Sequence, residues 1–293
     1  MSKVILTVGP SASGKTTWAN EQVRKNKGKI VNLNRDDIRR TLFVFNQWKD
    51  YKFTNAREGL VTDTQFAMAR SALSRGMTII VSDTNLNPAF RAKWEELAKE
   101  FKVAFELEVF HTDIKELTAR NLARENSVDP SVLKRQYLDY ATQFNGFKKY
   151  EADTSLPKAV IFDLDGTLAI MSDRGPFEWM RVGEDSVNTY VADLFRMIRA
   201  AHPDWKIITL SGRDGVCEQI TLDWLKENNL VSDYHFQRKL GDQRRDSIIK
   251  EEIFRQSIEK QFNVLYAVDD RQQVVDMWDM LGVQVWQVQQ SDF

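Results

Sequence analysis

Cysteine and histidine are scarce in this chain of 293 residues, which carries one cysteine and three histidines. With Cys217 alone, no disulfide can form within the chain, and a reducing compartment is indicated. None of the histidines, at positions 111, 202 and 235, is spaced with cysteine or glutamate as a zinc site requires. Neither a disulfide scaffold nor a structural zinc domain fits this sequence.

Long apolar runs are also missing. No run approaches the ~20 residues that a helix needs to span a bilayer. The opening residues 1–9 lack the long apolar core and small-residue cleavage site of a secretory signal. We therefore expect a cytosolic protein that makes no membrane contact.

The net charge is only −1, yet the two halves of the chain differ in sign. Residues 1–150 hold 25 Lys and Arg against 17 Asp and Glu, whereas residues 151–293 hold 16 against 25. A basic first half suits a polyanion such as nucleic acid. Charges scattered over a solvated surface would give the same totals, so charge alone leaves both interpretations open.

Apolar runs of strand length alternate with helical segments in both halves. The expected strands cover residues 4–8, 29–33, 78–83 and 103–110 in the first half, and 159–165, 205–212, 263–270 and 283–288 in the second. The polar stretch 145–158 contains a proline and is the expected linker. We therefore predict an α/β protein with two doubly wound parallel-sheet domains, residues 1–150 and residues 151–293.

A phosphate-binding loop is indicated by residues 9–16, GPSASGKT, which satisfy G-x-x-x-x-G-K-[ST] between a strand and a helix. Backbone N–H groups of such a loop converge on phosphates, and the positive end of the helix dipole adds to them. Lys15 would reach the β- and γ-phosphates of ATP, and the Thr16 hydroxyl would help to hold Mg²⁺. The alternative is a chance match in a glycine-containing turn. The residues expected to bind the nucleotide are Gly9, Ser11, Ser13, Gly14, Lys15, Thr16 and Thr17.

The stretch NRDDIRR, residues 34–40, follows the second expected strand, where ligand-facing residues lie in such sheets. Asp36 or Asp37 could accept a hydroxyl proton during attack on the γ-phosphate. Arg39 would share a helical face with Asp36 and could hold a substrate phosphate. Carboxylates near a helix start are also common without any function, because they stabilise the helix dipole.

Two further positions fit the same site. Asp83 ends the expected strand 78–83, where a carboxylate could support Mg²⁺ or orient the acceptor. Arg120 and Arg124 lie four residues apart on one helical face, and an arginine there could close over the phosphates. A solvated basic face is the alternative for this pair.

The second half contains the motif DLDGT. We expect Asp163 and Asp165 to point to the same side, because side chains alternate along a strand. Asp163 would attack phosphorus as a nucleophile, and Asp165 would protonate the leaving oxygen and then activate water. Mg²⁺ would offset the repulsion between carboxylate and phosphate. The expected metal ligands in this half are Asp163, Asp165, Asp269 and Asp270.

Other strand ends in this half supply partners for the same chemistry. Ser211 stands at the end of the expected strand 205–212 and could donate to a phosphate oxygen. Lys250 could neutralise the nucleophile and the transferred group. The alternative is a DxD pair that merely caps a turn. That alternative would require three strand ends to point to one site by chance.

In this order, the motifs resemble those of the bifunctional phage polynucleotide 5′-kinase/3′-phosphatase of the T4 type. The likeness covers nearly the whole chain. It rests on longer strings as well: NRDDIR (34–39), SDTNLNP (82–88), RGP (174–176), IKEEIF (249–254) and the tail from VDDRQQ to the C-terminus. The resemblance implies an N-terminal P-loop kinase, a C-terminal phosphatase of the haloacid-dehalogenase type, a homotetramer, and a phage protein acting in the bacterial host cytosol.

Roles follow from the resemblance position by position. It favours Asp36 over Asp37 as the general base and Arg124 over Arg120 as the arginine that closes over ATP. It makes Asp163 the nucleophile, Asp165 the acid/base and Asp270 a metal ligand. Positions implied to bind the substrate or complete the sites are Arg39, Asp83, Thr84, Arg174, Ser211, Arg213, Asp246 and Lys250. In the phosphate loop, Ser-Ala-Ser replaces the usual Pro-Gly-Ser, so one glycine is lost, and Thr16 replaces serine.

The resemblance implies that the two activities act on opposite ends of a break in DNA or RNA. The kinase would phosphorylate a 5′-hydroxyl, and the phosphatase would remove a 3′-phosphate or a 2′,3′-cyclic phosphate. The resulting 5′-phosphate and 3′-hydroxyl are what a ligase joins. Two other hypotheses stay open: a kinase for a nucleoside or small metabolite fused to a small-molecule phosphatase, and a nucleotide-sensing module that tethers a phosphatase.

Overall fold

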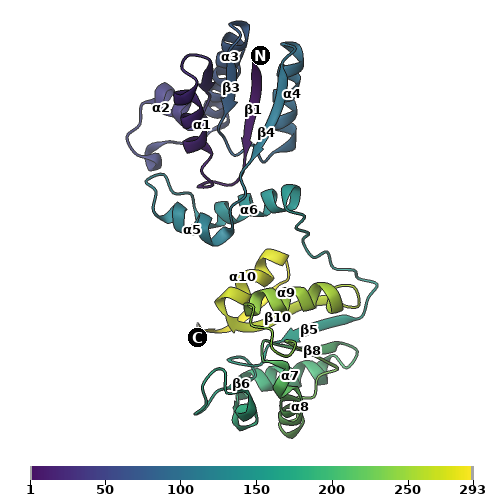
Figure 1. Cartoon of the computed structure of the whole chain (residues 1–293). Helices are drawn as coiled ribbons and strands as arrows, with labels where there is room; N and C mark the ends of the chain where they lie inside the picture. The colour runs from purple at the N-terminus through teal and green to yellow at the C-terminus, as the bar shows by residue number, and fades with distance from the viewer. Residues whose placement is uncertain (1, 292–293) are drawn as a thin grey trace. The chain divides into compact units, whose positions relative to one another are not determined.

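The structure, a computed structural model, describes residues 2–291. It divides into two compact units, Met1–Phe147 and Lys148–Phe293 (Figure 1). Within the described residues, no helix has both the length and the apolar character that a membrane span needs. Each unit contains one main parallel sheet, as the alternating sequence pattern predicted.

The first unit has a four-stranded parallel sheet in the order β2-β3-β1-β4. Its strands are β1 (Lys3–Val8), β2 (Ile30–Asn32), β3 (Thr78–Val81) and β4 (Ala104–Val109). Its helices are α1 (Lys15–Lys25), α2 (Arg35–Phe43), α3 (Asn55–Ser74), α4 (Pro88–Glu100), α5 (Ile114–Leu122) and α6 (Pro130–Phe144), and a 3₁₀ turn, η1, covers Trp48–Asp50. All four strands are parallel, so their carboxyl ends share one edge of the sheet.

The core of the first unit forms where apolar strand residues meet α3 and α4. Val4 and Leu6 of β1 and Ile79 of β3 are fully buried, and Trp94 of α4 stacks on Phe66 of α3 at 4.1 Å. Asn87 caps α4 by accepting from the N–H groups of residues 89 and 90, and Pro88 occupies the first helical turn. The buried sheet therefore fixes the loops that follow its strands.

The second unit has a five-stranded parallel sheet in the order β11-β10-β5-β8-β9. Its strands are β5 (Lys158–Phe162), β8 (Lys206–Ser211), β9 (Tyr234–Gln237), β10 (Asn263–Arg271) and β11 (Val285–Ser291). A small antiparallel pair, β6 (Ala169–Ile170) and β7 (Ser186–Val187), lies between β5 and α7 in the chain. Its helices are α7 (Thr189–Ala201), α8 (Glu218–Glu227), α9 (Asp246–Ile253) and α10 (Gln272–Leu281), with 3₁₀ turns η2 (Trp179–Glu184) and η3 (Gly215–Cys217) and the π-helical turn η4 (Phe254–Ile258).

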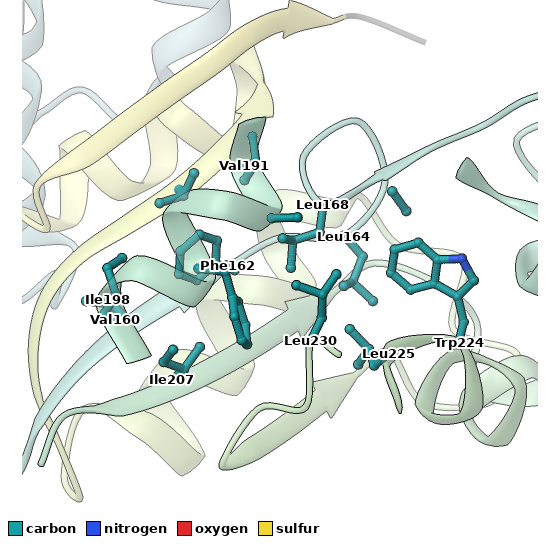
Figure 2. Close-up of a cluster of buried hydrophobic side chains, with 14 residues drawn as sticks. Val160, Phe162, Leu164, Leu168, Val191, Ile198, Ile207, Trp224, Leu225 and Leu230 are labelled. Atoms are coloured by element: carbon teal, nitrogen blue, oxygen red, sulfur yellow. The ribbon is translucent and has the colours of Figure 1, made fainter. Parts of the chain in front are cut away.

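A second core packs between this sheet and the helices on one face. Figure 2 shows Phe162 of β5 beside Leu164 and Leu168, with Trp224 of α8 at the edge of the cluster. These side chains are at most 2 % exposed. Leu164 and Leu168 flank the DGT turn, so apolar packing on both sides holds the motif in place.

The predicted α/β class with two parallel-sheet domains is confirmed, but two details differ. Strand β9 has the sequence YHFQ, which has no apolar run, and tertiary pairing with β8 makes it a strand. The expected strand 159–165 was too long, since β5 ends at Phe162 and the chain turns at Gly166, where φ is +84°. The alternation argument for Asp163 and Asp165 is therefore wrong.

Two candidate active sites

The phosphate loop joins β1 to α1 and folds around Lys15. The Lys15 ammonium is buried and donates to the Pro10 carbonyl at 2.5 Å and to the Ser13 hydroxyl at 3.2 Å. Gly14 has φ +96°, a conformation that glycine adopts without strain. Burial, with a smaller contribution from the Arg124 charge, lowers the pKa of Lys15 to about 7. The loop thus holds a lysine that gains a proton readily when an anion arrives.

A cavity of about 1100 Å³ opens beside this loop and collects most of the residues predicted for the kinase half. Both the loop and the carboxyl end of β3 line it. The predicted residues that line it are Ser11, Gly14, Lys15, Thr16, Thr17, Asp36, Arg39, Asp83, Thr84, Arg120 and Arg124. Gly9 and Ser13 were expected to bind nucleotide but are not among the lining residues.

The acceptor side of the cavity is built on the start of α2. Asn34 caps the helix by accepting from the N–H groups of Asp36 and Asp37, and its own amide donates to Ser82 at the end of β3. Both oxygens of Asp83 are also engaged: one accepts from the Arg35 N–H at 2.9 Å, the other from Gln65 at 2.7 Å. Burial raises the pKa of Asp83. Asp83 therefore ties α2 to α3, beside the cavity.

Asp36 and Arg39 form an ion pair at 2.6 Å inside this cavity. Arg39 also binds Glu58 of α3, with its Nε 3.0 Å from Oε1 and its second guanidinium nitrogen 2.6 Å from Oε2. Although burial opposes it, hydrogen bonding from Arg39, Arg35 and Tyr51 lowers the pKa of Glu58 to about 2. Sequence reasoning missed Glu58, because nothing near it in the chain marks a partner 19 residues away.

Arg120 and Arg124 behave differently. Arg120 pairs with Glu116 one helical turn earlier, and about half of each side chain is exposed. Arg124 lines the same cavity, and its Nε is buried with no hydrogen-bond partner among the described residues. Burial lowers the pKa of Arg124. The buried Nε of Arg124 argues against a solvated basic face for this residue, and its predicted role at ATP stays a prediction.

Gln136 of α6 is a second residue that sequence reasoning missed. Its side-chain oxygen accepts from the Ser11 N–H at 2.8 Å. Ala12, which follows Ser11 in the loop, has φ +66°, a left-handed conformation that costs about 1–2 kcal/mol for a residue with a β-carbon. Gln136 thus holds the loop at the point where a glycine would relieve backbone strain.

In the second unit, three buried carboxylates converge. Asp163 follows β5, and Asp269 and Asp270 belong to the end of β10; one oxygen from each lies within 4.8 Å of the others. Thr167, which sequence reasoning missed, donates to Asp270 at 3.1 Å. A β-carbon at Gly166 would lie 2.1 Å from an Asp270 oxygen, so only glycine fits there. Clustered carboxylate oxygens are the ligand set that Mg²⁺ prefers.

Lys250 of α9 enters this cluster. Its ammonium lies 2.6 Å from Asp163, 2.9 Å from Asp269 and 3.6 Å from Asp246, and the side chain is 1 % exposed. Burial raises the pKa of Asp163, and the Lys250 charge opposes that rise. The buried ammonium beside Asp163 therefore favours its ionised form.

Asp165 lies in a different set of contacts. It accepts from Arg213 at 2.7 Å and from Arg174 at 2.8 Å, and both arginines also bind Asp185. Although burial opposes it, the two guanidinium groups lower the pKa of Asp165. Its side chain is not part of the three-carboxylate group that we expected it to join as a metal ligand. Asp185 could not be predicted from the sequence, because it lies in a loop and belongs to no recognisable motif.

Ser211 and Asp246 complete the surroundings. Ser211 is fully buried at the end of β8, and its hydroxyl accepts from the Arg213 N–H at 3.1 Å. Asp246 starts α9 and lies against Gly212, where a β-carbon would come within 1.9 Å of its oxygen. Asp163, Asp165 and Asp246 line a cavity of about 590 Å³. Its lining does not include the other predicted residues Asp269, Asp270, Arg174, Arg213, Ser211 and Lys250.

The Gln136 contact predicts a change in nucleotide affinity. Gln136→Ala leaves the Ser11 N–H without its partner, and an unsatisfied donor costs about 1–3 kcal/mol. We expect the dissociation constant for ATP to rise about five-fold or more, as measured by calorimetry. Ala12→Gly in the same background should recover part of the loss, because it relieves the strain that Gln136 opposes. Unchanged ATP affinity in Gln136→Ala would show that the contact does not hold the loop.

The lowered pKa of Lys15 predicts proton uptake. A bound triphosphate raises that pKa, so MgATP binding at pH 8 should take up close to one proton, and at pH 6 far less, because Lys15 is already protonated there. Calorimetry in buffers of different ionisation enthalpy measures the uptake. Lys27→Gln, a change at an exposed lysine, should leave the proton uptake unchanged. Equal uptake at the two pH values would contradict the assignment.

Two family models divide the chain between them. Residues 157–293 match the Polynucleotide kinase PNKP phosphatase domain, and residues 4–144 match an AAA domain. A candidate bifunctional polynucleotide kinase/RNA ligase of Autographa californica nuclear polyhedrosis virus is 29 % identical over 296 residues. That match covers 96 % of this chain but 41 % of the viral protein, so the chain spans less than half of that relative.

Solved structures give similar matches. Two structures of Pnkp1/Rnl/Hen1 complexes contain chains that are 30 % and 28 % identical to this one, each with a TM-score of 0.47 and full coverage of this chain. The two matches extend over 98 % and 97 % of the length of those chains. The family models fall on the two units that carry the phosphate loop and the carboxylate cluster. The chain therefore belongs to the polynucleotide kinase–phosphatase family, with an N-terminal P-loop kinase domain and a C-terminal haloacid-dehalogenase-like phosphatase domain.

Proposed function

We propose that this protein heals broken nucleic-acid ends. The kinase domain, residues 1–150, transfers the γ-phosphate of ATP to a 5′-hydroxyl of DNA or RNA. The phosphatase domain, residues 151–293, removes a 3′-phosphate or a 2′,3′-cyclic phosphate. The observation that carries the proposal is that each unit has its own cavity, one lined by a phosphate loop and the other by carboxylates beside a buried lysine.

In the kinase cavity, Asp36 accepts the proton of the attacking 5′-hydroxyl. Arg39, held by Glu58 through a bidentate contact, places its positive charge beside the phosphate next to that hydroxyl, and this limits how far the acceptor can rotate. Lys15 and Arg124 stabilise the charge that develops on the transferred group. Thr16 would hold Mg²⁺ at the ATP phosphates.

In the phosphatase cavity, Asp163 attacks phosphorus and becomes an aspartyl-phosphate while the 3′-oxygen leaves. Asp165 supplies the proton to that oxygen and afterwards takes one from the attacking water, against the pull of Arg174 and Arg213 toward the ionised form. The Lys250 ammonium opposes the rise in the pKa of Asp163 that burial causes, and so favours its ionised form. Mg²⁺ held by Asp163, Asp269 and Asp270 would offset the repulsion between carboxylate and phosphate.

Partners and setting follow from the same family likeness. We propose that the chain assembles as a homotetramer, that its products pass to a ligase, and that it acts as a phage protein in the cytosol of a bacterial host. Sedimentation analysis tests the assembly. A small-metabolite kinase is the competing hypothesis; transfer of phosphate to free nucleosides but not to an oligonucleotide 5′-hydroxyl would favour it.

A two-ended assay tests the proposal directly. An oligonucleotide with a 5′-hydroxyl and a 3′-phosphate is incubated with ATP and Mg²⁺, and each end is analysed. Asp36→Asn should lower 5′-phosphorylation at least about 100-fold and spare 3′-dephosphorylation, since a missing general base costs about 10²–10⁴ in rate. Asp163→Asn should do the reverse. If the wild-type protein alters neither end, the proposed function is wrong.

Gly166 offers a sharper test of the phosphatase geometry. Gly166→Ala places a β-carbon against Asp270 at a backbone φ of +84°, so we expect 3′-phosphatase activity to fall more than about 100-fold. Gly175→Ala is the matched control, because the nearest atom to its β-carbon lies at 3.7 Å. The 5′-kinase rate should stay unchanged in both variants. Full phosphatase activity in Gly166→Ala would contradict the close approach of Asp270.

A further inference from the structure

An insertion between β6 and β7, residues 171–185, carries an exposed Phe177 and a half-buried Trp179 that line the phosphatase cavity. Phe177 is 80 % exposed, and its ring meets Trp179 edge to face at 5.9 Å. Both residues line the cavity of about 590 Å³ together with Met171 and Pro176. No proposed catalytic step uses them. An exposed apolar wall inside a catalytic cavity indicates a contact with the substrate.

The base of the insertion is held firmly. Arg174 and Asp185, near its two ends, are joined by two hydrogen bonds of 2.7 Å, and each side chain is 1 % exposed. Between them, the Gly175 N–H donates to Glu178 at 2.6 Å, and the Glu178 N–H donates back to the Gly175 carbonyl. The aromatic pair is thus presented by a fixed loop, and little ordering cost remains when a ligand arrives.

The occupant must share the cavity with the reacting phosphate, because Asp163 and Asp165 line it too. A partner protein or a membrane could not sit there while a phosphate group reaches Asp163. What remains is the substrate's own nucleoside, whose flat base offers a π-face to Phe177 or Trp179. On another part of the rim, Arg245 is exposed, and its guanidinium group has no ion-pair or hydrogen-bond partner within residues 2–291. A positive charge there suits the next backbone phosphate.

We propose that Phe177 and Trp179 form a stacking subsite for the nucleobase of the 3′-terminal nucleotide. The inference rests on the proposed 3′-phosphatase function and names what selects its substrate. Phosphate chemistry at Asp163 is the same for any phosphomonoester, so the aromatic pair makes the cavity prefer nucleic-acid ends. Stacking is tolerant of base identity because every base has a π-face, and the subsite therefore accepts all four bases.

The test compares two oligonucleotides of equal length. One ends in a thymidine 3′-phosphate, and the other ends in a 3′-phosphorylated abasic sugar analogue that has no base. Loss of a stacking partner costs about 5- to 150-fold, so Phe177→Ala and Trp179→Ala should lower kcat/KM on the first substrate about five-fold or more, mainly through KM. On the abasic substrate, the wild type should already be slower, and the variants should change the rate less than about two-fold.

Controls separate base contact from folding. Tyr190→Ala removes a ring that is 87 % exposed on α7 and does not line the cavity, so it should behave as wild type on both substrates. Trp179→Phe should retain most of the rate on the thymidine substrate. Equal losses on both substrates, or no loss on the first, would overturn the subsite. Failure of the wild type to hydrolyse either oligonucleotide would instead refute the proposed 3′-phosphatase function.

Discussion

The buried ammonium of Lys250 is the charge on which the phosphatase half depends. Three carboxylates crowd within reach of it, and without a cation their mutual repulsion and burial would favour protonation. Lys250 comes from α9, whereas Asp163 and Asp269 come from the ends of β5 and β10. The parallel sheet brings these elements to one edge, and the Lys250 charge offsets the repulsion between their carboxylates. The fold and the reactive charge state are therefore consequences of the same arrangement.

The kinase half solves the opposite problem, because it must gather positive groups around a triphosphate. Lys15 and Arg124 repel each other, and both lose water on burial. The carboxylates of Asp36, Glu58 and Asp83 lie around them and hold the neighbouring cations and the start of α2 in position. Each half thus places groups of opposite charge beside its reactive residues.

Much of this could be predicted from local patterns. The phosphate loop, the DLDGT turn and the alternation of strands and helices depend on residues that are close in the chain, so Lys15, Asp163 and the parallel sheets were predictable. Glu58, Gln136 and Asp185 were not, because each acts through a contact with a distant segment and stands in unremarkable sequence. Thr167 belongs to the DLDGT motif, but its contact with Asp270 joins segments 103 residues apart and could not be predicted from the motif. The error at Asp165 arose from extending β5 into a turn whose geometry depends on Gly166.

Arg174 binds Asp165 and also closes the base of the aromatic insertion through Asp185. The same side chain therefore holds the base of the insertion and lowers the pKa of Asp165, together with Arg213. The proton affinity of the reacting carboxylate and the anchoring of a surface loop therefore depend on one shared residue. One guanidinium group thus both fixes the loop that presents Phe177 and Trp179 and stabilises the charge on the carboxylate that handles the proton.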